Sequence, residues 1–187
     1  PSLSIAVSVF TIYFREANFF AQPMDKKREV QRTDKSPLGY YDRELTKRKR
    51  DLKAVFDYML PRPDGSDVNQ WPVDDVHFRQ TLVDFFNTAS AVTERTLALV
   101  HHALGGAAAD GASMPIGDPR TSTVRLNYYP TTDPLSRAKQ QSIAGLGEVA
   151  LGHHTDPDVL TLLLQDMTGG LQTLSKDHGW INVPPSV

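Results

Sequence analysis

The chain has 187 residues, of which 40% are hydrophobic and 22% charged, and its formal net charge at pH 7 is −2. This composition is ordinary for a soluble globular protein, and the near-neutral charge argues against a nucleic-acid binder or a strongly acidic partner. The absence of cysteine excludes disulfides, thiolate nucleophiles and Cys-based zinc sites, and it suits a reducing, cytoplasmic location. The length predicts one domain or part of a larger one.

The most apolar segment near the start is Ser4–Phe14. It is too short to span a bilayer, which needs about 20 residues, and it lacks the basic region and cleavage site of a signal peptide. We therefore expect a buried strand here and no membrane partner.

Residues 15–53 are basic, with 12 Lys and Arg against 7 Asp and Glu, and they include the run Lys47–Arg50. One interpretation is a nucleic-acid or membrane patch. The favoured one is a solvated helix face, because acidic residues are interleaved and aromatic stacking partners are few. Four apolar residues have helical spacing and predict a helix that packs on the core: Leu52, Val55, Phe56 and Met59.

The strongest helix pattern follows the loop Pro61–Pro72. Asp74 or Asp75 is placed to cap it, and Gly105-Gly106 is placed to end it. Apolar and small residues recur at steps of three and four: Phe78, Leu82, Phe85, Ala89, Val92, Thr96, Leu99 and Ala103. We expect this rod to brace a sheet, with His101 and His102 near its end structural or solvated rather than metal ligands.

The small-residue stretch Ala107–Ile116 predicts a linker, which divides a helical region, 1–120, from a β-rich region, 121–187. Within the second region, Thr121–Tyr129 alternates as a strand, with Val124, Leu126 and Tyr128 on one face. The opposite face carries Arg125, Asn127 and Tyr129. The pattern leaves two interpretations open: a face in water, or donors that line a barrel interior and bind an anion.

His154 and Asp156 lie two residues apart, so in a strand both side chains point to the same face. A histidine and a carboxylate on one face supply two of the three ligands of a non-haem Fe(II) facial triad. His153 would face away, and Asp158 is interpreted as a loop carboxylate. Downstream, Leu160–Gln165, a turn and Leu171–Leu174 predict a β-hairpin beside the pair.

The ordered series HTD, LTLLLQD, GGLQ, GW and VPP, from His154 to Pro185, closely resembles the isopenicillin N synthase-like group of Fe(II)/2-oxoglutarate-dependent dioxygenases. The resemblance implies that His154 and Asp156 are iron ligands on a double-stranded β-helix (jelly roll). RLNYYP resembles the group's Asn-x-Tyr motif, which implies 2-oxoglutarate contacts from Asn127 and Tyr129 and leaves Arg125 as a pocket-wall residue. The expected fold class is α+β: a helical support region plus the first half of the jelly roll.

The two ends of the chain depart from the group. Residues 1–14 do not match its usual start, and we interpret them as a mis-predicted or truncated start. The chain stops at Val187, before the group's distal histidine and its Arg-x-Ser motif. We therefore expect residues 1–187 alone to be inactive and to aggregate.

The resemblance implies an oxygenase that uses Fe(II), 2-oxoglutarate and O2 to hydroxylate, desaturate or cyclise a small organic molecule. It implies no nucleic-acid partner, and the sequence does not set the oligomeric state. The alternative is a non-catalytic, truncated relative with a binding role. The third histidine is the feature that separates the two.

Overall fold

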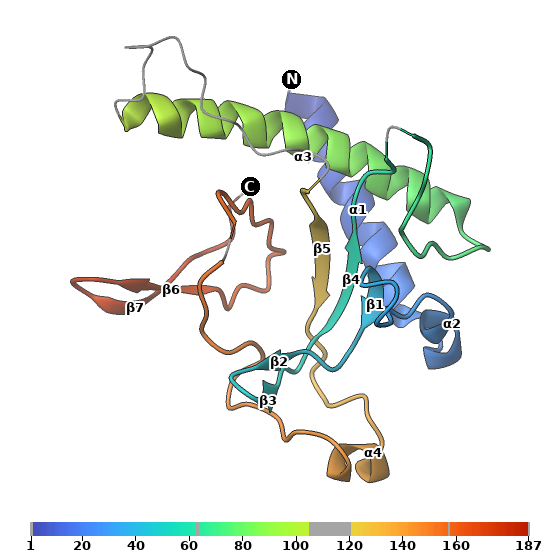
Figure 1. Ribbon diagram of the computed structural model, residues 1–187. Coiled ribbons are helices and arrows are strands. Elements are labelled where there is room, and N and C mark those ends of the chain that lie inside the picture. Colours follow the sequence, from blue (N-terminus) through green and yellow to red (C-terminus); the bar gives the residue numbers. More distant parts are fainter. Residues whose placement is uncertain (1, 63, 105–120, 157, 187) are drawn as a thin grey trace.

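A three-stranded antiparallel sheet lies at the centre of the computed structural model, which describes residues 2–62, 64–104, 121–156 and 158–186 (Figure 1). Its strands are β1 (Gly39–Tyr41), β4 (Ala54–Tyr58) and β5 (Val124–Tyr128), in the order β1-β4-β5. The sheet therefore joins strands from both sides of the predicted 120/121 division. The helices and antiparallel strands agree with the α+β class.

The strand register sorts side chains onto two faces of this sheet. Tyr40 and Leu126 lie opposite Phe56 from either side, so all three share an apolar face. Arg125 lies opposite Asp57 and therefore on the other, polar face, which also carries Asn127. The alternation predicted for Val124–Tyr128 is confirmed.

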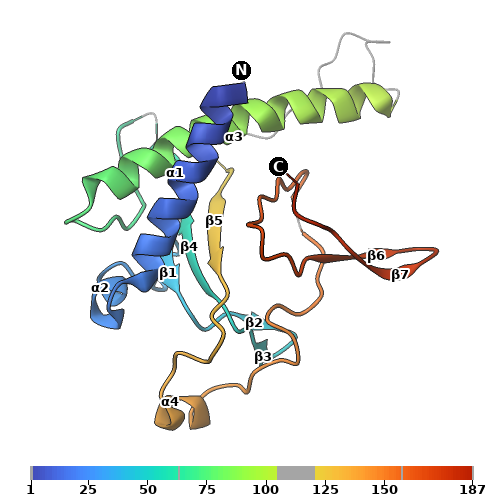
Figure 2. The same cartoon turned by 180° about the vertical axis from the view of Figure 1, so that it is seen from behind.

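Two helices, α1 (Ser2–Ala21) and α3 (Val76–Ala103), lie over the apolar face, as seen from behind in Figure 2. The ring of Phe19 on α1 lies 5.0 Å from that of Phe56 and 4.9 Å from that of Phe78 on α3, measured between centroids. Asp75 caps α3, because its Oδ1 accepts a hydrogen bond from Phe78 N at 2.9 Å. The predicted long helix is confirmed; Gly105-Gly106 and the linker 107–116 lie outside the described residues.

Two secondary-structure predictions in the first third of the chain are wrong. Ser4–Phe14, expected as a strand, belongs to α1, in which Ile12, Phe19 and Phe20 fall on one helix face and are buried. The helix expected from the spacing of residues 52–59 is the strand β4. All five β4 residues are buried because the strand is central and covered on both sides, so no alternation marks it.

Two short helices and a hairpin complete this part: α2 (Met24–Glu29), α4 (Arg137–Gln141), and β2 (Leu45–Thr46) paired with β3 (Lys49–Arg50). Lys47 and Arg48 form the hairpin turn, with φ of 51° and 67°. The interpretation of Lys47–Arg50 as a helix face is therefore wrong. The helix α4 lies in the connection that follows β5. No described helix has the length and apolar character needed to cross a membrane.

The C-terminal hairpin is formed by β6 (Gln172–Ser175) and β7 (Gly179–Asn182), one step further along the chain than predicted. Leu160–Gln165 forms no strand. Gln165 instead uses its side chain, donating from Nε2 to the carbonyl of Val183 at 3.0 Å, so this segment lies beside the end of the hairpin without backbone pairing. The predicted strand at Leu171–Leu174 is confirmed as β6, within one residue.

Candidate functional site

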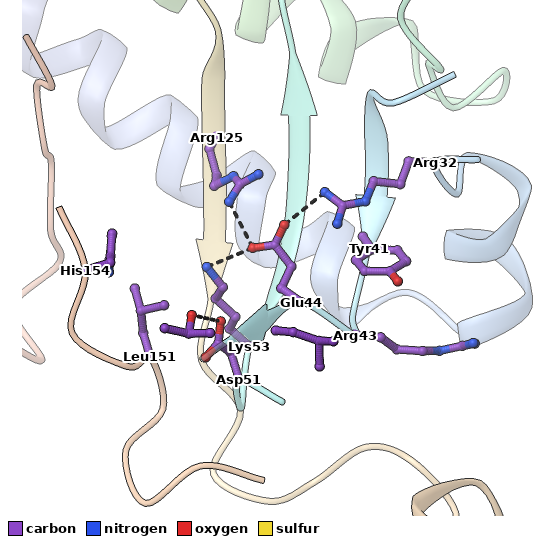
Figure 3. Close-up of a pocket in the computed structure, with 11 residues that line it drawn as sticks. Arg32, Tyr41, Arg43, Glu44, Asp51, Lys53, Arg125, Leu151 and His154 are labelled. Carbon is purple, nitrogen blue, oxygen red and sulfur yellow. Dashed lines mark hydrogen bonds and ion pairs between the residues drawn. The ribbon is translucent and has the colours of Figure 1, made fainter. Parts of the chain in front are cut away.

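A pocket of about 570 Å³ opens on the polar side of the sheet (Figure 3). Arg125 on β5 and His154 on the C-terminal segment both line it, together with Glu44 and residues of the β2–β3 hairpin. The pocket therefore brings the predicted pocket-wall arginine and one predicted iron ligand to the same space. Asp156, Asn127 and Tyr129 are not among the described residues that line it.

Glu44 is the centre of an ion-pair network in this pocket, as Figure 3 shows. Its carboxylate accepts hydrogen bonds from Arg32 at 2.9 Å and Arg125 at 2.9 Å, and pairs with Lys53 at 3.0 Å. Burial alone raises the pKa of Glu44, but the ion pairs with Arg125, Lys53 and Arg32 outweigh it and hold the pKa below its usual value. The carboxylate stays ionised, and it fixes three cationic side chains.

Arg125 is held from a second side by Asp57 on the neighbouring strand. Its Nε and Nη2 donate to the two Asp57 oxygens at 2.7 and 2.8 Å, a bidentate arrangement that fixes the plane of the guanidinium. Sequence reasoning missed Asp57 and Glu44. For Asp57 the available signal was a carboxylate inside the otherwise apolar stretch AVFDY of β4.

His154 and Asp156 come together as predicted, but not on a strand. The segment from Gly152 to Asp156 has no regular backbone pairing, so the prediction of a strand carrying both ligands is wrong. The contact forms instead because Nδ1 of His154 donates to the Gly152 carbonyl at 3.0 Å, which turns Nε2 to within 3.4 Å of Asp156 Oδ1. Both side chains are about half exposed, at 46% and 49%.

This arrangement suits a metal ion. A hydrogen bond from Nδ1–H to a backbone carbonyl fixes the imidazole tautomer and leaves Nε2 with its lone pair as the ligand atom. The carboxylate of Asp156 supplies an oxygen donor beside it. No set of three or more His, Cys, Asp and Glu that could hold a metal occurs in the part of the chain that the structure describes.

The other predicted residues lie around the pair. Asn127 is on the polar face of the sheet, opposite Val55. Burial raises the pKa of Tyr129, and the carboxylates of Asp51 and Glu44 raise it further. His153 is directed elsewhere: its Nε2 contacts Lys47 Nζ, and its ring lies edge-on to Trp180 at 5.7 Å.

Known proteins resemble this chain both in sequence and in fold. Residues 120–187 match the family model of the 2OG-Fe(II) oxygenase superfamily. Gibberellin 2-beta-dioxygenase 2 of Arabidopsis thaliana is 31% identical over 109 residues, which cover 58% of this chain and 30% of that protein. Flavone synthase of Petroselinum crispum is 28% identical, with 96% of this chain and 46% of that protein covered. The chain spans less than half of either relative.

Solved structures share the fold over nearly the whole chain. A Neurospora crassa protein, solved in complex with alpha-KG and 5-formyluracil, has a TM-score of 0.69 at 26% identity, and the match covers 94% of this chain and 53% of that one. A 2OG-Fe(II) oxygenase family protein from Caulobacter crescentus has a TM-score of 0.72 at 24% identity, covering 99% and 60%. The ordered motifs and the family model agree over the same part of the chain, and residues 120–187 match the 2OG-Fe(II) oxygenase superfamily.

Proposed function

We propose that the polypeptide that carries these residues is a non-haem Fe(II)- and 2-oxoglutarate-dependent oxygenase acting on a small organic molecule. The observation that carries the proposal is the His154–Asp156 pair, with Nδ1 of the imidazole bonded to Gly152 and Nε2 directed to the carboxylate. Fe(II), 2-oxoglutarate and O2 are the cofactor and cosubstrates of the superfamily. Hydroxylation, desaturation and cyclisation are the outcomes that this chemistry offers.

Each residue has a defined task in this proposal. His154 and Asp156 would hold the iron through one nitrogen and one oxygen, and the third ligand of the triad would come from outside the described residues. When bound, the metal and 2-oxoglutarate supply the activation of O2. Asn127 and Tyr129 donate hydrogen bonds to 2-oxoglutarate, whose carboxylates are acceptors. Arg125, fixed by Asp57 and Glu44, forms part of the substrate wall.

Both the similar proteins and the volume of the pocket support a small-molecule substrate. The Neurospora crassa protein is in complex with 5-formyluracil, and several sequence relatives are named gibberellin dioxygenases. A pocket of about 570 Å³ has the dimensions of a site for one small molecule. A cytoplasmic location and the division at residues 120/121 are part of the same proposal.

Succinate formation from 2-oxoglutarate, measured with the full natural polypeptide, tests the proposal. His154→Ala and Asp156→Ala should each lower turnover by at least about a hundredfold, because the loss of a metal ligand removes the centre that activates O2. His178→Ala is the matched control, since this exposed histidine lies between β6 and β7. Absence of succinate from the wild type under anaerobic iron loading followed by O2 would favour the non-catalytic relative instead.

A further inference from the structure

The β2–β3 hairpin contacts the segment that leads to His154 through the backbone. Arg50 N donates to Gly145 O at 2.9 Å, and Gly147 N donates to Arg50 O at 3.0 Å, which forms a parallel bridge to Leu146. Two backbone hydrogen bonds thus join elements almost 100 residues apart in the chain. The hairpin fixes where the metal-binding segment begins.

Thr46 of the hairpin lies against Gly152 of this segment. A Cβ on Gly152 would lie 2.7 Å from Cγ2 of Thr46 and 3.1 Å from its Cβ, so only glycine fits without a shift. Thr46 is itself fixed, because its Oγ1 donates to Asp51 Oδ2 at 2.9 Å. Gly152 in turn accepts the Nδ1–H of His154 on its carbonyl oxygen. A shift of Thr46 would therefore move Gly152, and with it the carbonyl that orients the His154 imidazole.

Side chains of the basic run Lys47–Arg50 also hold the β2–β3 hairpin against its neighbours. Lys47 contacts the ring of His153, beside the ligand, and the buried Arg50 pairs with Asp133 in the loop after β5. Two of the four cationic side chains are thus engaged within the protein. This arrangement gives the run a structural role that neither a nucleic-acid patch nor a solvated helix face would require.

We propose that the β2–β3 hairpin positions the metal-binding segment, with Gly152 as the positioning residue that seats against Thr46 and orients His154. This inference rests on the proposed function, because it takes His154 as a metal ligand. Residues that orient a metal-binding histidine change metal affinity by about 10- to 100-fold when they are altered. A shift of Gly152 should therefore weaken metal binding.

The test is Mn(II) binding to the full natural polypeptide, measured by electron paramagnetic resonance, with circular dichroism confirming the fold of each variant. Gly152→Ala should raise the Kd for Mn(II) by at least about tenfold. Thr46→Ser keeps the hydroxyl that bonds Asp51 and removes the methyl nearest Gly152, so alone it should leave the Kd nearly unchanged. Combined with Gly152→Ala, it should restore most of the lost affinity. Gly145→Ala is the matched control, because its added Cβ meets nothing within 4 Å.

The outcomes separate the inference from the proposed function. If the wild type does not bind Mn(II), the proposed function fails. If the wild type binds and Gly152→Ala binds equally well, the inference is overturned. The same holds if Gly145→Ala weakens binding as much as Gly152→Ala, or if Thr46→Ser gives no recovery, since either result would mean a general disturbance of the loop.

Discussion

The support core and the segment that carries His154 and Asp156 are built in opposite ways. In the core, Phe56 and Leu82 are fully buried between the sheet and the helices. In the C-terminal part, Leu163 and Trp180 are 59% and 50% exposed, and the described backbone between residues 147 and 171 forms no helix or strand. Apolar burial stabilises the core, whereas individual hydrogen bonds to the hairpin hold the segment that leads to His154 and Asp156.

Because of this difference, we expect substitutions in the core to change the stability of the fold and substitutions near His154 to change the site. The buried side chains of the core carry the stability, and a change there should act through the whole fold. Near His154, a single displaced contact should change the site while leaving the fold intact. The exposed apolar side chains of the C-terminal part form the kind of surface on which proteins associate.

The largest effect is expected from removing a ring at the centre of the core. Phe56→Ala should lower the free energy of unfolding by about 3–5 kcal/mol, because it leaves a cavity among the surrounding aromatic rings. Phe14→Ala is the control: the same chemical change at a side chain that is 55% exposed should cost less than about 1 kcal/mol. Urea unfolding measures both, and equal losses would contradict the assignment of stability to this core.

A smaller loss in the free energy of unfolding is expected from breaking the ion pair between Arg50 on the hairpin and Asp133 in the loop after β5. Asp133→Ala leaves the Arg50 guanidinium, only 3% exposed, without its carboxylate and should cost about 3 kcal/mol. Asp177→Ala, an exposed carboxylate between β6 and β7, should change the free energy of unfolding by less than about 0.5 kcal/mol. A neutral Asp133→Ala would mean that the hairpin is not anchored through this pair.

The smallest effect concerns Glu16 on α1, whose pKa burial and the charge of Asp166 raise to about 7. A carboxyl with a raised pKa in the folded state favours folding at low pH, and that contribution falls as the pH rises from about 4.5 to about 7. Glu16→Gln should flatten this decline and stabilise the protein at pH 8 by about 1–2 kcal/mol, which is less than the full rise in pKa implies at about 1.4 kcal/mol per pKa unit, because solvent screens a side chain that is only partly buried. Thermal unfolding at pH 5 and pH 8 tests it; an unchanged pH dependence would contradict it.

Local patterns predicted the elements that are amphipathic along their own length. The helix α3 and the strand β5 each show one buried and one open face, and both predictions are confirmed. The strand β4 was missed because burial on both faces removes the alternation that identifies a strand. The helix α1 was missed because a short apolar run does not distinguish a buried strand from a helix.

The candidate site was predictable only where its residues are close in sequence. His154 and Asp156 were identified from a two-residue spacing, although a ring-to-backbone hydrogen bond, not a strand, brings them together. Asp57 and Glu44 hold Arg125 across 68 and 81 residues, and no local pattern records such pairs. The roles of Asn127 and Tyr129 toward 2-oxoglutarate stay predictions.

Metal binding by the His154–Asp156 pair is the central claim, and anaerobic titration of the full natural polypeptide with Mn(II) tests it most directly. We predict one high-affinity ion for the wild type and for His178→Ala, and loss of that site in both His154→Ala and Asp156→Ala. Retention of the ion by either ligand variant, with unchanged affinity and stoichiometry, would contradict the account.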